Sequence, residues 1–295
     1  MGKINKEILL QPVSEDMPCG EDLSDLTEYY VLEELAKGKE ETQFSEAESP
    51  EWSKVFSMAV QLLEQGKELW VFVHLLTSIV SLDGAKGLSE GLDLLYEALK
   101  RFWDDIYPKL DEDEDNPAEQ RMNILNNLTT VGSMFFEGIK DIPLCNSKQL
   151  GVFSWRHVLL ANGGIPPAKN QEVPKMALIE AAIKESDPEL ISDIHMALSR
   201  SVKSIHDIDQ FLTQQVGSFN NTSKITLLAD LLDNMIDTIQ SVINIKRADD
   251  DVPDETFETS EDVLFATTFQ QSINQDIASQ KDVILMLHQV SLWYA

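Results

Sequence analysis

The stretch EWSKVFSMAVQLLEQGKELWVFVHLLTSIVSLDGAKGLSEGLDLLYEALKRF, residues 51–102, decides which fold this sequence predicts. Its first part repeats apolar side chains every three or four positions up to Gly66, which predicts an amphipathic helix. Its second part is apolar on nearly every side, as expected of the central helix of a bundle, and ends at Asp83-Gly84. A third amphipathic segment runs from Lys86 to Phe102. Because only a few residues connect these segments, we expect three antiparallel helices.

The remainder of the chain predicts more helices. Asn116 and Pro117 are a typical cap and first residue of a helix, and an apolar stripe follows at Met122, Leu125, Leu128, Val131 and Phe135. Residues 141–174 are rich in proline and glycine, so we expect an irregular connection there with one short turn at 154–160. Further helices are predicted at 176–184, 188–215 and 223–246.

No segment combines β alternation with hairpin turn residues. The predicted fold class is therefore all-α, an antiparallel helical bundle domain followed by further helices and an acidic linker. The apolar stripe of the last helix continues to the final residue, so we expect the last domain to be truncated. The predicted domains are a helical domain at 1–165, a second helical region at 175–246, an acidic linker at 247–270 and the start of a C-terminal helical domain at 271–295.

Composition limits the function. The chain has 51 Asp and Glu against 23 Lys and Arg, a formal net charge of -28. Such a charge repels nucleic acid and anionic lipid and favours partners with basic patches. The longest apolar run, residues 69–76, is too short to span a bilayer, so no direct membrane insertion is expected. Cys19 and Cys145 stand alone without a CxxC spacing, which is typical of a reducing compartment.

The acidic run at 111–115 is the candidate for a metal site. Asp111, Asp113 and Asp115 match the first three ligands of a calcium loop. That loop also needs glycine at its sixth position and glutamate at its twelfth, where this sequence has Asn116 and Met122. The run therefore predicts a solvated turn between helices and no metal site, with a calcium-responsive turn as the alternative.

Catalytic patterns are missing from the sequence. Its five histidines are scattered, and it has no GxSxG, no SxxK and no glycine-rich phosphate loop followed by Lys and Ser or Thr. We therefore expect no enzyme activity and no cofactor. The residues favour a helical module that binds other proteins, and a general acidic adaptor is one alternative.

Two stretches resemble a known family. PCGEDLSDLTEYYVLEELAKG, residues 18–38, is followed at 51–128 by a helical region that contains Trp103-Asp104, Tyr107-Pro108 and Arg121-Met122-Asn123. Their order and spacing resemble the ImpA-type N-terminal domain of the TssA family of type VI secretion, over about the first 160 residues.

The resemblance implies a non-enzymatic assembly factor in the cytoplasm. Such a protein contacts the baseplate and membrane complex and helps to prime or cap the tail tube and sheath. It implies that a complete protein is a large homo-oligomer through its C-terminal region, whereas this chain is a monomer or dimer. We expect the rigid elements flanking the bundle and the acidic turn to bind partners. These residues are Pro18, Gly20, Glu21, Asp22, Trp103, Tyr107, Pro108, Asp111, Asp113 and Asp115.

Overall fold

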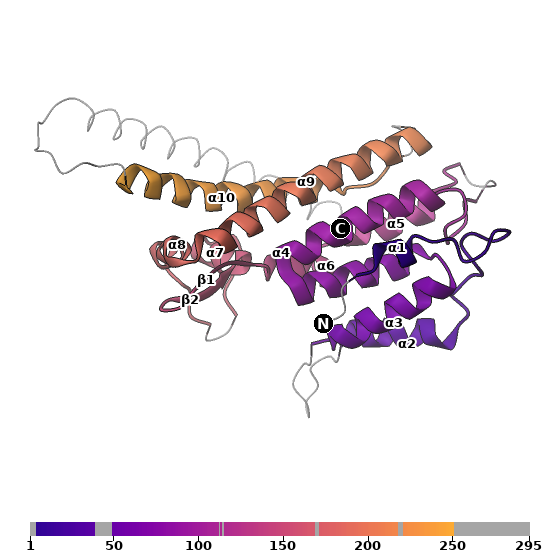
Figure 1. The fold of residues 1–295 in the computed structure, drawn as a ribbon, viewed down its shortest axis with the longest axis horizontal. Helices are drawn as coiled ribbons and strands as arrows, with labels where there is room; N and C mark the ends of the chain where they lie inside the picture. Colours follow the sequence, from indigo (N-terminus) through magenta and orange to yellow (C-terminus); the bar gives the residue numbers. More distant parts are fainter. Residues whose placement is uncertain are drawn as a thin grey trace, which may run out of the picture. The chain divides into compact units, whose positions relative to one another are not determined.

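The structure, a computed structural model, describes residues 4–38, 49–111, 113, 115–168, 171–217 and 221–250. Residues Met1–Asp249 form one compact unit (Figure 1). Residues 247–250, predicted to begin the acidic linker, are the end of a helix. The remainder of that linker, 251–270, and the region 271–295 lie outside the described residues. The elements are α1 (Lys6–Leu9), α2 (Thr27–Lys37), α3 (Trp52–Gln65), α4 (Leu69–Phe102), α5 (Glu119–Asn126), η1 (Asn127–Thr129), α6 (Met134–Lys140), β1 (Pro143–Ser147), β2 (Gly151–Ser154), α7 (Trp155–Ala161), α8 (Met176–Glu185), α9 (Pro188–Val216) and α10 (Thr226–Asp250).

The segment α4 is a helical hairpin. Gly84 has φ +58° and ψ -134°, which breaks the helix where the sequence predicted an end. A Cβ at Gly87 would lie 2.3 Å from the Ile79 carbonyl oxygen, and one at Gly91 would lie 2.4 Å from the side chain of Leu76. Residues eight and fifteen positions apart touch only if the chain folds back, so the two halves of α4 are antiparallel.

Composition alone would also allow α4 to cross a membrane, since it is long and apolar. However, 67% of its most apolar window is buried inside the protein. The break at Gly84 divides the segment into halves that pack on each other and on α3, whose buried face carries Val55, Ala59 and Leu62. The apolar surface of α4 is therefore the core of the bundle.

The helix predicted after Pro117 is interrupted, which corrects the sequence analysis. It divides into α5, η1 and α6, because Gly132 adopts φ +87° and Ser133 caps α6 by accepting a hydrogen bond from the Phe136 amide at 3.2 Å. Val131, expected on the buried stripe, is 77% exposed. The apolar spacing of this region came from two short helices with different faces.

The all-α prediction holds for a predominantly helical chain, but a two-stranded sheet corrects it. Strands β1 and β2 pair antiparallel within the stretch predicted to be irregular, with Cys145 opposite Phe153. The Ser147 hydroxyl accepts hydrogen bonds from the amides of Gln149 and Leu150, which stabilises the turn. Strands of five and four residues, with proline or glycine at their starts, show too little alternation to be recognised. The short turn predicted at 154–160 is helix α7.

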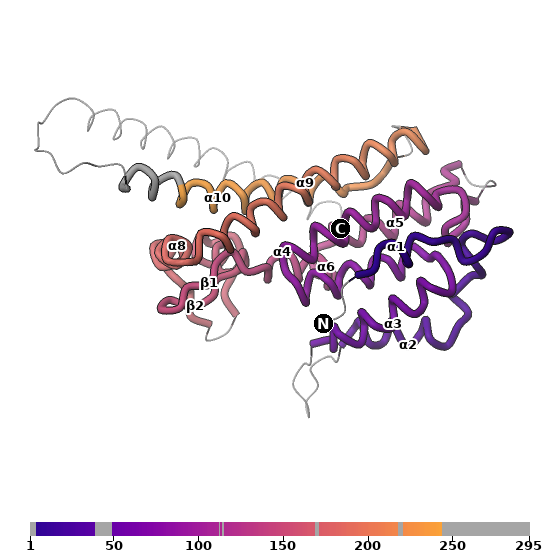
Figure 2. The backbone as a smooth tube through the Cα atoms, viewed as in Figure 1, coloured from indigo at the N-terminus to yellow at the C-terminus, as the bar shows by residue number. Residues whose placement is uncertain are grey.

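Helices α8 and α9 pack on the first region. As predicted, Asp187 caps α9 by accepting a hydrogen bond from the Glu189 amide at 3.0 Å, with Pro188 as the first residue. Helix α9 lies along α4, although more than a hundred residues separate their starts (Figure 2). Trp103 packs edge-to-face on Phe211 at 5.6 Å between ring centroids. The division at residue 165 stays a prediction, and within this unit both parts share one core.

Candidate protein-interaction sites

One candidate site is a corner where three segments meet at the open end of the α4 hairpin. The Lys67 amide donates to the Cys19 carbonyl at 2.8 Å, and the Tyr107 amide donates to the Lys67 carbonyl at 3.0 Å. The Leu69 amide donates to the Tyr107 carbonyl at 2.8 Å. Residues 67–69 therefore join the two rigid segments that the sequence selected, 18–23 and 103–108.

Glycines allow the first of these segments to approach so closely. Gly20 has φ +66° and forms a bridge with Gly66. A Cβ on Gly20 would lie 2.4 Å from the Gln65 carbonyl oxygen, and one on Gly66 would lie 2.8 Å from the Leu23 side chain. The PCGEDL opening is thus fixed to the end of α3 by backbone contact, which no side chain at either position would permit.

Arg121 holds the other segment. Its side chain is fully buried, and its guanidinium donates to the carbonyls of Pro108 at 2.8 Å, Ile106 at 2.7 Å and Trp103. It also lies 4.8 Å from the centre of the Trp103 ring. Burial lowers its pKa to about 10, still well above neutral pH, so the group stays charged. A cation at the end of a helix is stabilised by the free carbonyls there, and Arg121 fills that role for α4.

Two further charged side chains are buried in the joining strip. Lys67 is 1% exposed, and its ammonium donates to the Leu63 carbonyl at the end of α3, while burial lowers its pKa. Glu68 is 5% exposed and caps α4 by accepting from the amides of Trp70 at 3.1 Å and Val71 at 3.0 Å. Burial raises the pKa of Glu68 to about 7, against the opposing effect of these two hydrogen bonds. Both groups thus have structural roles at helix ends.

The predicted binding residues divide into supporting and exposed groups. Trp103 is buried in the core, and Pro18, Gly20, Tyr107 and Pro108 are half-buried in the corner, with a cis peptide bond between the last two. The exposed members are all acidic, namely Glu21, Asp22, Asp111, Asp113 and Asp115. The corner therefore offers carboxylates on a rigid support.

The described residues of the acidic turn form local hydrogen bonds. The Asp111 carboxylate accepts from the Asp113 amide at 3.1 Å, and the Asp111 amide donates to the Pro117 carbonyl at 3.0 Å. Among the described residues, no three His, Cys, Asp or Glu side chains are grouped to hold a metal. Glu112 and Glu114 lie outside those residues, so the calcium alternative stays untested.

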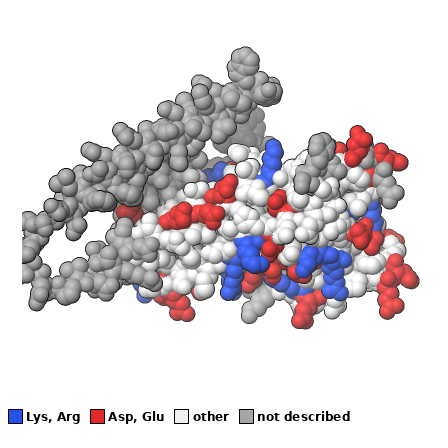
Figure 3. Space-filling view, turned by 90° about the horizontal axis from the view of Figure 1, so that it is seen from above, with Lys and Arg blue, Asp and Glu red and all other residues white. Residues whose placement is uncertain are grey.

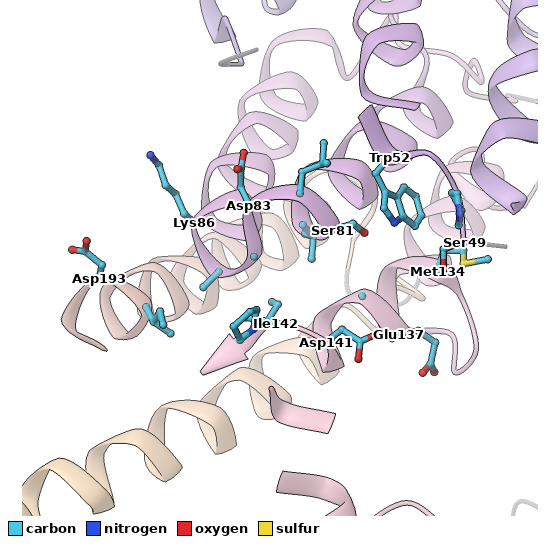
Figure 4. Close-up of a pocket in the computed structure, with 18 of the residues that line it drawn as sticks. Ser49, Trp52, Ser81, Asp83, Lys86, Met134, Glu137, Asp141, Ile142 and Asp193 are labelled. Atoms are coloured by element: carbon cyan, nitrogen blue, oxygen red, sulfur yellow. The ribbon is translucent and has the colours of Figure 1, made fainter. Parts of the chain in front are cut away.

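A second candidate site is a pocket of about 910 Å³ at the Gly84 bend, the other end of the hairpin. Figure 4 shows Trp52 from the start of α3 beside Met134 of α6, and Asp193 of α9 toward the opposite end. Asp83 lies at the bend, and Ile142 lies on the far wall. The sequence predicted the bend but missed the pocket, because α6 and α9 reach it only through tertiary packing.

One wall of the pocket is fixed by ion pairs. Arg156 binds Asp141 at 2.5 Å and Glu137 at 3.1 Å, and Lys140 binds Glu137 at 2.7 Å. These partners outweigh the effect of burial and lower the pKa of Glu137. The two carboxylates of this wall are therefore already neutralised by the protein's own cations.

Comparisons with known proteins agree with this architecture. The family described as ImpA, N-terminal, type VI secretion system, matches residues 10–130, which include α2 to α5 and the whole corner. A solved structure of the N-terminal domain including the conserved ImpA_N region of the TssA component from Burkholderia cenocepacia matches with a TM-score of 0.66. It is 18% identical, and the match covers 83% of this chain and 95% of that one, which shows the shared fold. The class is thus a helical domain of the ImpA N-terminal type.

A closer sequence relative is the type VI secretion system component TssA1 of Pseudomonas aeruginosa, 35% identical over 215 residues. The match covers 72% of this chain and 61% of that protein, so the chain spans less than two thirds of the relative's length. The chain belongs to the TssA family of the type VI secretion system.

Proposed function

We propose that the chain is a non-enzymatic assembly factor of the type VI secretion system. The observation that carries this proposal is the 35% identity to TssA1 over 215 residues, which is 72% of this chain. In this role it acts in the cytoplasm, contacts the baseplate and membrane complex, and helps to prime or cap the growing tube and sheath. The large homo-oligomer that the family resemblance implies is part of the same proposal.

The chemistry of the corner supports binding rather than catalysis. Strongly perturbed titratable groups often mark active sites. Here Arg121, Lys67 and Glu68 have a simpler explanation, because each satisfies backbone groups at the end of a helix. Their side chains are buried and already hydrogen bonded, so they stabilise the corner. The groups of the corner that a partner can contact are its exposed acids.

The surface charge supports a basic partner. Figure 3 shows acidic side chains spread over the described surface in that view, and the net charge of the chain is -28. A negative surface accelerates association with a positively charged partner, and this effect weakens as the salt concentration rises. We infer that the corner acids, Glu21, Asp22, Asp111, Asp113 and Asp115, contribute to such a contact.

Pull-down with purified baseplate, sheath, tube and membrane-complex proteins tests the proposal. We expect the wild-type chain to retain at least one of them and the variant D111K/D113K/D115K to retain less. The matched control is D230K/D233K/D237K, which makes the same charge change on exposed positions of α10. If the wild-type chain retains none of these components, the assembly role is wrong. If both variants lose binding equally, the contact depends on overall charge and the corner has no special part.

A further inference from the structure

We propose that the pocket at the α4 bend docks a segment of a partner protein that presents a Lys or Arg side chain next to an apolar one. The inference rests on the proposed function in one respect, namely that the partner belongs to the secretion machine. Its evidence is the chemistry of the two ends of the pocket. One end has carboxylates without a partner, and the other has the half-buried Trp52 and the exposed Met134.

The acidic end is formed by Asp83 and Asp193. Both side chains are exposed, and within the described part of the chain neither takes part in an ion pair or a side-chain hydrogen bond. Lys86 also lines the pocket, but its ammonium lies 4.0 Å from Glu90 and is thus directed to a carboxylate of its own helix. Together with Lys86, Asp83 and Asp193 give this end of the pocket one net negative charge, which favours a cation from outside.

The other acids of the pocket lining are already paired, which directs a cationic ligand to Asp83 and Asp193. Glu137 and Asp141 are bound by Lys140 and Arg156, so a cationic ligand gains less from them. Lys37, the remaining cation of the lining, binds Glu34 at 2.8 Å. A Lys or Arg side chain of the partner is therefore attracted more strongly to Asp83 and Asp193 than to Glu137 and Asp141.

The apolar end is formed by Trp52 and Met134, which lie side by side (Figure 4). Met134 is 43% exposed, and the nearby Val131 is 77% exposed. Aromatic and methionine side chains are enriched in protein interfaces, where tryptophan often contributes most to affinity. An apolar side chain seated here would remove exposed surface that the isolated chain leaves in water.

Size and charge favour a peptide segment as the occupant. A volume of about 910 Å³ accepts several side chains, and the two ends of the pocket call for groups of different chemistry. Nucleic acid and other phosphate ligands are disfavoured by the acids and by the net charge of -28. A protein segment supplies both a cation and an apolar group from adjacent positions, and its backbone can cross the space between them.

Selection from a phage-displayed library of random dodecapeptides on the immobilised chain tests the inference. We expect the selected peptides to share a Lys or Arg beside an apolar residue. For the best peptide, titration monitored by fluorescence anisotropy should show affinity reduced about tenfold by D83N/D193N, since two exposed charge pairs are lost. Met134→Gln, an exposed position where folding is preserved, should reduce affinity about fivefold. The control D233N/D237N on α10 makes the same charge change and should have no effect.

Several results would overturn the inference. The first is that no peptide is selected, or that selected peptides have no basic residue. The second is that their binding survives D83N/D193N. The third is concentration-dependent self-association that D83N/D193N abolishes, which would make a second copy of the chain the occupant.

The pull-down separates this inference from the proposed function. If D83N/D193N retains every component as the wild type does, the pocket proposal fails while the assembly role stands. If the wild type retains no component but peptides bind the pocket, the assembly role fails while the pocket proposal stands.

Discussion

Replacing Arg121 should reveal how much the corner depends on one buried cation. In Arg121→Met the side chain keeps most of its apolar volume, but the carbonyls of Trp103, Ile106 and Pro108 lose their donor. Each buried carbonyl left without a partner costs about 1–3 kcal/mol. The lowered pKa shows that burying the charge is itself unfavourable, by roughly 3 kcal/mol, and the substitution removes that cost. The net loss of unfolding free energy should be about 3 kcal/mol.

Urea denaturation followed by far-UV circular dichroism measures this loss. Arg200→Met is the matched control, because Arg200 is exposed on α9 and its replacement should change stability by less than about 0.5 kcal/mol. Arg121→Lys should fall between the two, since one ammonium keeps the charge but cannot reach three carbonyls in the planar geometry of a guanidinium. An Arg121→Met protein as stable as the control would refute the view that the guanidinium holds the corner.

Three further predictions use other parts of the same unit. Glu68 has a pKa raised from 4.5 to about 7, so its folded form holds the proton more tightly, and stability should fall by up to roughly 3 kcal/mol as pH rises from about 4.5 through 7. Glu68→Gln, which keeps a capping oxygen, should flatten that profile in denaturation experiments, and an unchanged slope would assign it to another group. Gly87→Ala should lower the melting temperature, because its Cβ meets backbone at 2.3 Å and overpacking costs about 1–3 kcal/mol, whereas Gly138→Ala, with its nearest contact at 3.6 Å, should not; equal effects would argue against the α4 hairpin. Cys19 and Cys145 are buried with raised pKa values, so Ellman's reagent should modify them only after unfolding, and fast labelling of the native chain would contradict their burial.

Local patterns predicted the elements whose burial is one-sided or complete. The start of α3, the bend at Gly84 and the Asp187-Pro188 start of α9 follow from periodicity, glycine and capping, which act within a few residues. The break before α6 was missed because Val131 keeps the helical spacing of the stripe while lying 77% exposed. Periodicity reports which residues share a face only if the helix is continuous. The β-hairpin was missed for the complementary reason, since its strands are too short to show a period.

The sites depend on contacts that no local pattern contains. The sequence selected the segments around Pro18 and Trp103 as rigid, and the structure joins them through residues 67–69. Arg121 belonged to the family resemblance, but its role follows only from the position of the α4 end, eighteen residues earlier in the chain. The pocket required α6 and α9 to meet the Gly84 bend. A sequence thus predicts which residues are rigid or charged, and the tertiary fold decides which of them share a surface.

The two candidate sites lie at opposite ends of one hairpin. The corner forms where residues 67–69 and 103–108 pair, and the pocket forms at Gly84. The first half of α4 contains about 15 residues, and at 1.5 Å per residue the ends are roughly 20 Å apart. That distance exceeds the screening length of about 8 Å at physiological salt, so charge changes at one end have little electrostatic effect at the other. If a partner binds the corner acids, as proposed, its charge has little effect on Asp83 and Asp193, so the two proposed contacts are electrostatically independent.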